Sequence, residues 1–217
     1  MIPLYHDLSD ETVLVLGGGA VGARKARRFA EEARVVVVSP TFAPSLSESS
    51  TERIELVRAA PDATGVADWI DRTSPALVVA ATDDATINAA AAEAADRAGA
   101  LVNRTDVSGG RRVGSVVVPG TVEDGPVSVA ISTGGASPAL TKVLRERIEA
   151  EIEGAGAMAA LSGTLRAELQ AREIDPERRR EAIRAVVRSE RVWKGLQEGE
   201  SNGRQEADKV IEEVLLG

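Results

Sequence analysis

The chain has 217 residues, with 26 Lys and Arg against 34 Asp and Glu, so its formal net charge is −8 with the single histidine neutral. An acidic chain with only two Trp, two Phe and one Tyr lacks the basic face and stacking platforms that nucleic-acid binding needs. The absence of cysteine excludes disulfides and thiolate metal sites, and one histidine cannot form a His-rich site. We therefore expect no resident metal, and we assign acid–base chemistry to carboxylates or Lys.

Short β-branched runs alternate with Ala-rich amphipathic stretches over the first 110 residues. This alternation is typical of strands joined by crossover helices in a parallel sheet. The predicted strands are 13–16, 35–38, 54–57, 76–81 and 101–103, and the predicted helices are 20–31 and 85–98. Apolar runs such as the four valines at 35–38 indicate strands that are covered by helices on both faces.

The pattern changes in the second half of the chain. Alternating segments at 114–118 and 127–132 flank turn residues at 123–126, which predicts a hairpin. A helix follows, with Ser137 as its N-cap and Pro138 in its first turn.

That helix carries one apolar stripe, which we expect to be buried and which consists of Leu140, Val143, Leu144 and Ile148. From about residue 154 onward the sequence predicts helices. One of them restarts at Glu177, after Asp175-Pro176, with an apolar face formed by Ile183, Val186 and Val187. The last helix is expected over 204–216, after a loop at 199–203.

We therefore predict an α/β fold in three parts. They are a Rossmann domain with a parallel sheet over residues 1–112, a small α/β segment over 113–153 and a C-terminal helical domain over 154–217.

A glycine loop occupies residues 17–22, with the sequence Gly-Gly-Gly-Ala-Val-Gly. It fits the pattern G-x-G-x-x-G directly after a predicted strand and directly before a predicted helix, which is the context of a dinucleotide-binding loop. The pyrophosphate would lie on the helix N-terminus, where free N–H groups favour anions. The candidate cofactor-binding residues here are Gly17, Gly19, Ala20, Val21 and Gly22. The alternative is a glycine turn that binds nothing.

The second strand ends without an acidic residue, in Ser39, Pro40 and Thr41. A carboxylate at this place binds the ribose hydroxyls in NAD-binding folds. Ser39 or Thr41 can hydrogen-bond a ribose, but neither repels a 2′-phosphate as a carboxylate would. This segment alone therefore leaves the choice between NAD and NADP open.

Polar residues follow the fourth and fifth strands, and ligands in such folds lie beyond these strand ends. Thr82, Asp83 and Asn103 are candidate cofactor-binding residues. In the alternative interpretation, Thr82 and its neighbours only cap the next helix. Asp106 lies where a substrate would meet the nicotinamide, and it is the candidate catalytic residue, although a lone carboxylate can also be structural.

Basic residues are expected near the strand ends where cofactor and substrate would meet. They are Arg24, Lys25, Arg104, Arg111 and Arg112. Arg suits bidentate recognition of carboxylates, so a polyanionic substrate is indicated; an ordinary Arg-rich surface is the alternative. The Gly-rich segment at 132–138 can bind a carboxylate through its N–H groups or can simply start a helix. The candidate substrate-binding residues are Arg104, Ser132, Thr133 and Ser137.

Several blocks together resemble the N-terminal domain of siroheme synthases and the stand-alone precorrin-2 dehydrogenases. They are Ile2-Pro3-Leu4, residues 13–19 with Val21 and 24–26, residues 80–84 with Asn88, Asn103 with Asp106, and residues 132–138. They occur in the order of the family and cover essentially the whole chain, most weakly after about residue 155. The segment at 107–112 is longer and more Gly-rich than in the family.

The resemblance implies NAD-dependent oxidation of precorrin-2, a carboxylate-rich tetrapyrrole, to sirohydrochlorin on the route to siroheme. Asp106 matches the catalytic aspartate of the family and would accept a proton as hydride leaves for the nicotinamide. Burial beside the macrocycle would raise the pKa of this carboxyl and make it a stronger base. Family members are homodimers, in which the segment corresponding to 113–153 intertwines with its mate.

Two alternatives remain open. In the first, the enzyme is bifunctional and also inserts ferrous iron as a sirohydrochlorin ferrochelatase. In the second, the chain is a nucleotide-sensing module of a potassium transporter, which shares the glycine loop but has no counterpart of residues 103–106.

The N-terminus lacks the basic start and apolar stretch of a signal peptide, and no apolar run approaches the roughly 18 residues of a membrane span. We therefore expect a cytoplasmic protein with no membrane partner. No methyltransferase sequence follows, so we do not expect the methylations of fused siroheme synthases.

Overall fold

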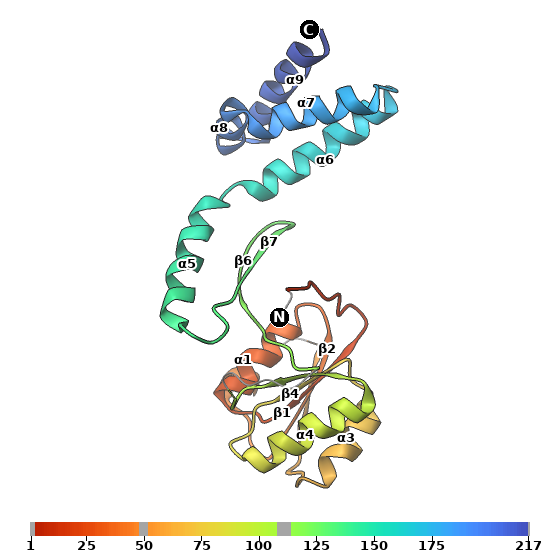
Figure 1. Cartoon of the computed structure of the whole chain (residues 1–217), viewed down its shortest axis with the longest axis vertical. Helices are drawn as coiled ribbons and strands as arrows, with labels where there is room; N and C mark the ends of the chain where they lie inside the picture. Colours follow the sequence, from red (N-terminus) through yellow and green to blue (C-terminus); the bar gives the residue numbers. More distant parts are fainter. Residues whose placement is uncertain (1–2, 48–51, 108–113, 217) are drawn as a thin grey trace. The chain divides into compact units, whose positions relative to one another are not determined.

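The computed structural model describes residues 3–47, 52–107 and 114–216 (Figure 1). The chain divides into two compact units, Met1–Val118 and Pro119–Gly217. The three-part division at 112/113 and 153/154 stays a prediction. Within the described ranges, no helix is long and apolar enough to cross a membrane.

The first unit is built on a five-stranded parallel sheet in the order β3-β2-β1-β4-β5. Its strands are β1 Thr12–Leu16, β2 Arg34–Ser39, β3 Ile54–Arg58, β4 Leu77–Ala80 and β5 Leu101–Arg104. Its helices are α1 Ala20–Phe29, α2 Pro44–Ser47, α3 Gly65–Thr73 and α4 Ala85–Ala98. The parallel sheet and all five predicted strands are confirmed, and α2 and α3 are additional.

Helices cover both faces of this sheet. Successive side chains of a strand point to opposite sides, so the apolar strands present apolar residues on both faces. Val13 and Val15 pack with Ala23 of α1 on one face. Leu14 and Val36 pack with Ile70 of α3 on the other, where α4 also lies. Figure 1 shows α1 on one side of the sheet and α3 and α4 on the other.

The strand order reverses at β1, which pairs with β2 on one side and with β4 on the other. In open α/β sheets, ligands bind outside the carboxyl ends of the strands at this switch point. The residues that follow β1, β4 and β5 are therefore placed at one edge of the sheet.

The second unit consists of a hairpin and helices. The hairpin strands are β6 Gly120–Asp124 and β7 Val127–Ile131, which pair antiparallel. The helices are α5 Pro138–Glu151, α6 Ala155–Ala171, α7 Pro176–Arg188, α8 Glu190–Glu198 and α9 Glu200–Leu216. Their core includes Met158, Leu165, Leu169, Val186 and Val192.

The hairpin turn and its second strand are confirmed, but the predicted first strand at 114–118 is wrong. That segment lies beside β5, with a parallel bridge between Val102 and Ser115 and a bond from Val116 N to Val102 O of 2.8 Å. Pro119 follows it, and proline has no N–H to donate to a strand ladder. The pairing strand starts only at Gly120.

The predicted loop at 199–203 is also wrong, because α9 already begins at Glu200. Gly203 lies inside this helix, and a Cβ there would overlap the side chain of Leu196 on α8. The glycine permits the close approach of α8 and α9 and does not end a helix.

The predicted N-cap at Ser137 is confirmed, whereas two predicted apolar faces are less buried than expected. Ser137 accepts a bond from Leu140 N, and Asp175 caps α7. No residue of α5 is buried, and Leu140 and Val143 are 49% and 43% exposed. The expected burial of the α5 stripe is therefore wrong for the chain by itself. On α7, Val187 is 39% exposed.

Candidate functional site

The glycine loop connects β1 to α1 through close backbone contacts. Gly17 has a φ of 107°, which favours glycine, and a Cβ there would overlap the carbonyl of Ala81. A Cβ on Gly22 would overlap the carbonyl of Gly17. The loop therefore needs glycine at both positions to bring α1 against the carboxyl ends of β1 and β4.

The middle of the loop is open at the start of α1. Gly19 is the N-cap of α1, no side chain caps this helix, and a Cβ on Gly19 would meet nothing within 4 Å. Gly19, Ala20 and Val21 are exposed, and the first turn of α1 contains no acidic residue. N–H groups at an uncapped helix start are suitable donors for a pyrophosphate.

The segment after β2 contacts this glycine loop. Ala43 N donates to Gly18 O at 2.8 Å, and a Cβ on Gly18 would lie 2.5 Å from Thr41 O. Ser39 is buried, whereas Pro40 and Thr41 are exposed. The segment expected to bind the ribose is thus held beside the segment expected to bind the pyrophosphate.

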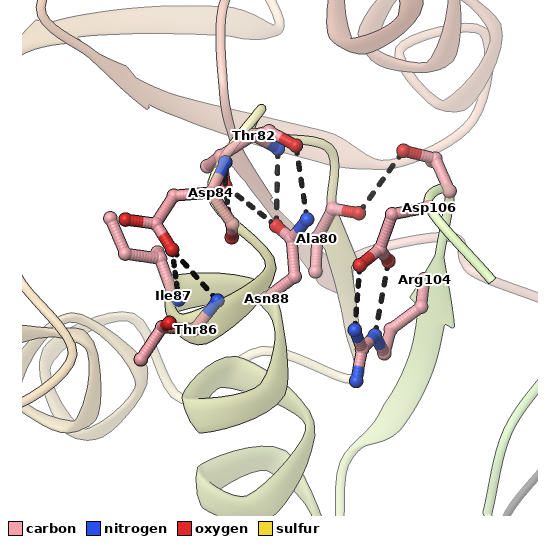
Figure 2. A network of polar contacts seen from close by, with 9 residues as sticks. Ala80, Thr82, Asp84, Thr86, Ile87, Asn88, Arg104 and Asp106 are labelled. Carbon is pink, nitrogen blue, oxygen red and sulfur yellow. Dashed lines mark hydrogen bonds and ion pairs between the residues drawn. The ribbon is translucent and has the colours of Figure 1, made fainter.

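Asn88 organises the loop after β4 (Figure 2). This buried side chain accepts from Thr82 N at 3.1 Å and Thr82 Oγ1 at 2.8 Å, and it donates to Thr82 O at 3.0 Å. Asp84 caps α4 through Thr86 N and Ile87 N, so the capping role is confirmed for Asp84. Asp83 is exposed.

Asn88 is absent from the predicted site residues although it belongs to the block that resembles the family. Its signal in the sequence is a single amide within an Ala-rich helix, on the face that also carries Ala91, Ala92 and Ala95. A polar residue on such a buried face must find hydrogen-bond partners.

The end of β5 forms hydrogen bonds with the end of β4 and with the segment around Val116. Thr105 donates to Ala80 O through its N at 3.0 Å and its Oγ1 at 3.3 Å. Asn103 is buried and its Nδ2 donates to Val116 O at 2.8 Å. Its Oδ1 is buried and has no hydrogen-bond partner within the described residues. Among the described residues, this amide oxygen is therefore a free acceptor near the carboxyl end of β5.

Asp106 forms a bidentate pair with Arg104. Arg104 Nε lies 3.0 Å from Asp106 Oδ1, and Nη2 lies 2.6 Å from Oδ2. The two side chains are 25% and 23% exposed. The bond from Arg104 lowers the pKa of Asp106 below its usual value, burial opposes this, and the Asn88 side chain lowers it further. The increase expected beside a macrocycle is therefore not present in the chain alone.

The other predicted residues lie in several places. Arg24 is exposed, and Lys25 is half-buried, with its pKa lowered to about 8 by burial and by Arg24 and Arg28. Arg111 and Arg112 lie outside the described residues.

The remaining predicted residues belong to the second unit. Thr133 Oγ1 lies 3.2 Å from Thr141 Oγ1, Ser132 Oγ accepts from Gly134 N, and Ser137 caps α5. Among residues 3–47, 52–107 and 114–216, no group of three or more His, Cys, Asp and Glu is arranged to hold a metal ion.

Comparison with known proteins covers both units. Residues 4–120 match the family model described as putative NAD(P)-binding, and residues 124–151 match the model described as sirohaem biosynthesis protein central. A precorrin-2 dehydrogenase of Methanosarcina barkeri is 31% identical over 99% of this chain and 95% of that protein. The chain belongs to the family of precorrin-2 dehydrogenases and siroheme synthases. The predicted resemblance is confirmed.

Siroheme synthases of this family are longer proteins. The siroheme synthase of Stutzerimonas stutzeri is 35% identical to this chain over 100% of its length, and that of Aeromonas salmonicida is 33% identical over 98%. This chain spans only 44% of the length of each of these proteins. The solved structure of SirC, a precorrin-2 dehydrogenase, has a TM-score of 0.73 at 24% identity and covers 96% of this chain and 100% of that one. This likeness confirms the predicted fold class.

Proposed function

We propose that this chain oxidises precorrin-2 to sirohydrochlorin with NAD as the hydride acceptor, within siroheme biosynthesis. The observation that carries this proposal is the similarity to the Methanosarcina barkeri precorrin-2 dehydrogenase over nearly the full length of both proteins. A nucleotide-sensing transporter module would leave unexplained the second family match, at residues 124–151.

The open start of α1 supports the cofactor. The N–H groups of its first turn, around Gly19, Ala20 and Val21, would bind the pyrophosphate, and Ser39 and Thr41 would bind the adenosine ribose. When bound, NAD supplies the acceptor for a hydride.

The nicotinamide end would lie beyond β4 and β5, where Thr82, Asp83 and Asn103 are the candidate contacts. The unpartnered Asn103 Oδ1 is a buried acceptor, so it suits an N–H donor such as the carboxamide of the cofactor. Asn88 would act indirectly, by fixing the conformation of the Thr82 segment.

Asp106 would take the proton that the substrate loses together with the hydride. Arg104 keeps this carboxylate ionised and ready to accept a proton. A substrate carboxylate that pairs with Arg104 would draw the guanidinium away from Asp106. The pKa of Asp106 would then rise, which makes it a stronger base at the moment the substrate is bound.

The candidate contacts for substrate carboxylates are Arg104 in the first unit and, taken separately, the segment of the second unit that holds Ser132, Thr133 and Ser137. In that segment Gly134 and Gly135 have φ values of 65° and 88°, and Cβ atoms on them would meet nothing within 4 Å. An open turn of this kind can present backbone N–H groups to an anion.

We also propose that the protein is a homodimer and that it works in the cytoplasm, where its dinucleotide is available. The apolar residues Leu140 and Val143 of α5 are about half exposed in the chain by itself. A second copy covering this face would remove them from water, as the resemblance to the dimeric family implies.

The test is anaerobic incubation with precorrin-2 and NAD, followed by the absorbance of sirohydrochlorin and of NADH. We expect Asp106→Asn to lower turnover by about 100-fold or more, the contribution typical of a general base, while its Kd for NAD stays unchanged. Asp71→Asn, at an exposed carboxylate of α3, is the matched control. Absence of NAD-dependent product from the wild-type protein would contradict the proposal.

The bifunctional alternative has a separate test. Ferrous iron and sirohydrochlorin, without NAD, report chelation alone. Siroheme formation faster than in a protein-free sample would establish a second activity, and an equal rate would rule it out.

A further inference from the structure

Helix α1 carries four cations and no carboxylate, and the cations are Arg24, Lys25, Arg27 and Arg28. Arg27 and Arg28 lie in its last turn, where a cation interacts favourably with the helix dipole. Arg24 and Lys25 lie in the middle of the helix, where the dipole gives them no such stabilisation. The stability of α1 therefore does not explain why these two positions carry positive charge.

Lys25 is a half-buried cation that lacks an opposite charge. Burial and the positive charges of Arg24 and Arg28 lower the pKa of Lys25 to about 8, and no carboxylate in the described part of the chain opposes this shift. Loss of water and like-charged neighbours both disfavour the ammonium form. The folded chain by itself therefore holds this ammonium unfavourably, and a bound anion would stabilise it.

The elements packed against α1 do not supply the missing negative charge. They are β1, β2, β4 and α2. The strands β1 and β4 and the helix α2 contain no charged residue. The one charged residue of β2, Arg34, is already paired with Glu55 at 2.6 Å. The charged groups that act on Lys25 are thus the two arginines of its own helix.

Helix geometry places Arg24 and Lys25 beside the open start of α1. Side chains of a helix point back toward its N-terminus, so each covers the turn before it. Val21 is three residues before Arg24 and four before Lys25, which makes it a neighbour of both on the helix surface. Val21 is itself 39% exposed, and no side chain caps this helix start. Two cations and one apolar side chain therefore share a patch next to the glycine loop.

This patch combines the two properties that a carboxylate-rich macrocycle requires. A tetrapyrrole presents apolar ring edges, for which Val21 is suitable, and carboxylates at its rim, for which a cation pair is suitable. A pyrophosphate, the other anion expected at this loop, has no apolar part and would leave Val21 unused.

We propose that Arg24 and Lys25, together with Val21, bind a rim carboxylate of the tetrapyrrole substrate. This inference rests on the proposed function and deepens it, because it assigns part of the substrate site to α1. It concerns binding of the tetrapyrrole, and it is separate from the hydride and proton transfer.

The test is titration of the full chain with sirohydrochlorin, without NAD, followed by tryptophan fluorescence, and a parallel calorimetric titration with NAD alone. Loss of a hydrogen bond between charged groups corresponds to about 10- to 100-fold in Kd. We expect Lys25→Met, which keeps the length of the side chain, to raise the sirohydrochlorin Kd by that factor and to leave the NAD Kd unchanged. Lys25→Arg, which keeps the charge, should restore most of the affinity.

The pH dependence of the sirohydrochlorin Kd distinguishes a charge contact from a packing role. Lys25 of the free chain loses its proton as the pH rises through about 8, so we expect the wild-type Kd to increase between pH 7 and pH 9.5. Lys25→Met and Lys25→Arg have no group that titrates at this position, so this increase should be absent from both. An increase of equal size in all three proteins would overturn the proposal.

Arg27→Gln is the matched control, because it removes one positive charge from an exposed position in the last turn of the same helix. We expect it to leave the sirohydrochlorin Kd within about twofold of the wild type. A loss of affinity equal to that of Lys25→Met would overturn the proposal, since it would reflect the overall charge of α1. Urea denaturation at pH 7 should show Lys25→Met to be no less stable than the wild type; a less stable variant would contradict the unfavourable charge on which the proposal rests.

The outcomes separate this inference from the proposed function. A higher NAD Kd with an unchanged sirohydrochlorin Kd in Lys25→Met would overturn the inference, because the cations would then serve the cofactor, and would leave the proposed dehydrogenase intact. Failure of the wild type to bind sirohydrochlorin would also overturn it. Weakened sirohydrochlorin binding by Lys25→Met would support the site even if the wild type did not oxidise precorrin-2 with NAD.

Discussion

Arg104 and Asp106 face each other as a bidentate pair across a single intervening residue, Thr105 (Figure 2). Arg104 is the last residue of β5 and Asp106 lies in the bend that follows it, while Thr105 between them donates to the carbonyl of Ala80. The strand end therefore fixes the pair in position, and the pair sets the protonation of the carboxylate.

Arg104→Gln should shift the pH dependence of catalysis. Because the bond from Arg104 lowers the pKa of Asp106, its loss raises this pKa, and we expect the acid limb of kcat/KM to move to higher pH. Arg97→Gln, at an exposed residue of the last turn of α4, serves as the control. An unmoved acid limb in Arg104→Gln would show that Asp106 does not titrate in the catalytic step.

The same pair makes folding stability depend on pH. The folded pKa of Asp106 lies below its unfolded value of 3.8, so the pair stabilises the protein above pH 3.8 and loses this contribution as the pH falls through the folded pKa. Urea denaturation between pH 5 and pH 3 should show a smaller decrease in stability for Arg104→Gln than for the wild type.

Asn88→Ala should destabilise the first unit and weaken NAD binding. The variant loses three hydrogen bonds to Thr82, and at about 1 kcal/mol for each we expect a loss of roughly 2–4 kcal/mol in the free energy of unfolding. Urea denaturation measures the loss, and titration gives the Kd of NAD. Thr86→Ala, at an exposed side chain of the same helix, should change neither. A loss of stability with an unchanged Kd would show that the Thr82 segment does not contact the cofactor.

Val143→Asp should disrupt the proposed dimer. Val143 is 43% exposed on α5, and a carboxylate would be unfavourable in an apolar interface. We expect light scattering to give about half the mass of the wild type. Arg145→Asp, on an exposed position of the same helix, should keep the wild-type mass. If the wild type is itself monomeric, the dimer proposal is wrong.

Two Gly→Ala variants should have opposite effects on the second unit. A Cβ on Gly203 would overlap Leu196 and also lie 3.1 Å from Leu196 N, so we expect a loss of about 1–3 kcal/mol. A Cβ on Gly163, in the middle of α6, would meet nothing within 4 Å, so helix propensity should increase stability by about 0.5–1 kcal/mol. Chemical denaturation measures both. A stabilising Gly203→Ala would refute the close contact of α8 and α9.

Local signals in the sequence were sufficient for the elements that depend on near neighbours. The β-branched runs identified all five parallel strands, α4 has its predicted bounds, and Ser137 caps α5 as expected. Caps and apolar runs are decided within a few residues along the chain, which is why they were predictable.

Features that depend on distant parts of the chain were not predictable. The segment at 114–118 lies along β5 because it finds hydrogen-bond partners there, and Gly203 lies within α9 at a place where a Cβ would overlap Leu196 of α8. Arg58 meets Pro40 only through the register of β2 and β3. The exposed stripe of α5 has the pattern of a buried face, since periodicity does not say which molecule covers it.

Asn103 has a single amide group that serves two purposes. Its nitrogen holds Val116 in the segment that leads out of the first unit, and its oxygen has no partner within the described residues. Under the proposed function, rotating this amide to suit a different ligand would place its oxygen against the carbonyl of Val116. One side-chain rotamer would therefore determine both the orientation of the nicotinamide and the anchoring of the chain's exit toward the second unit.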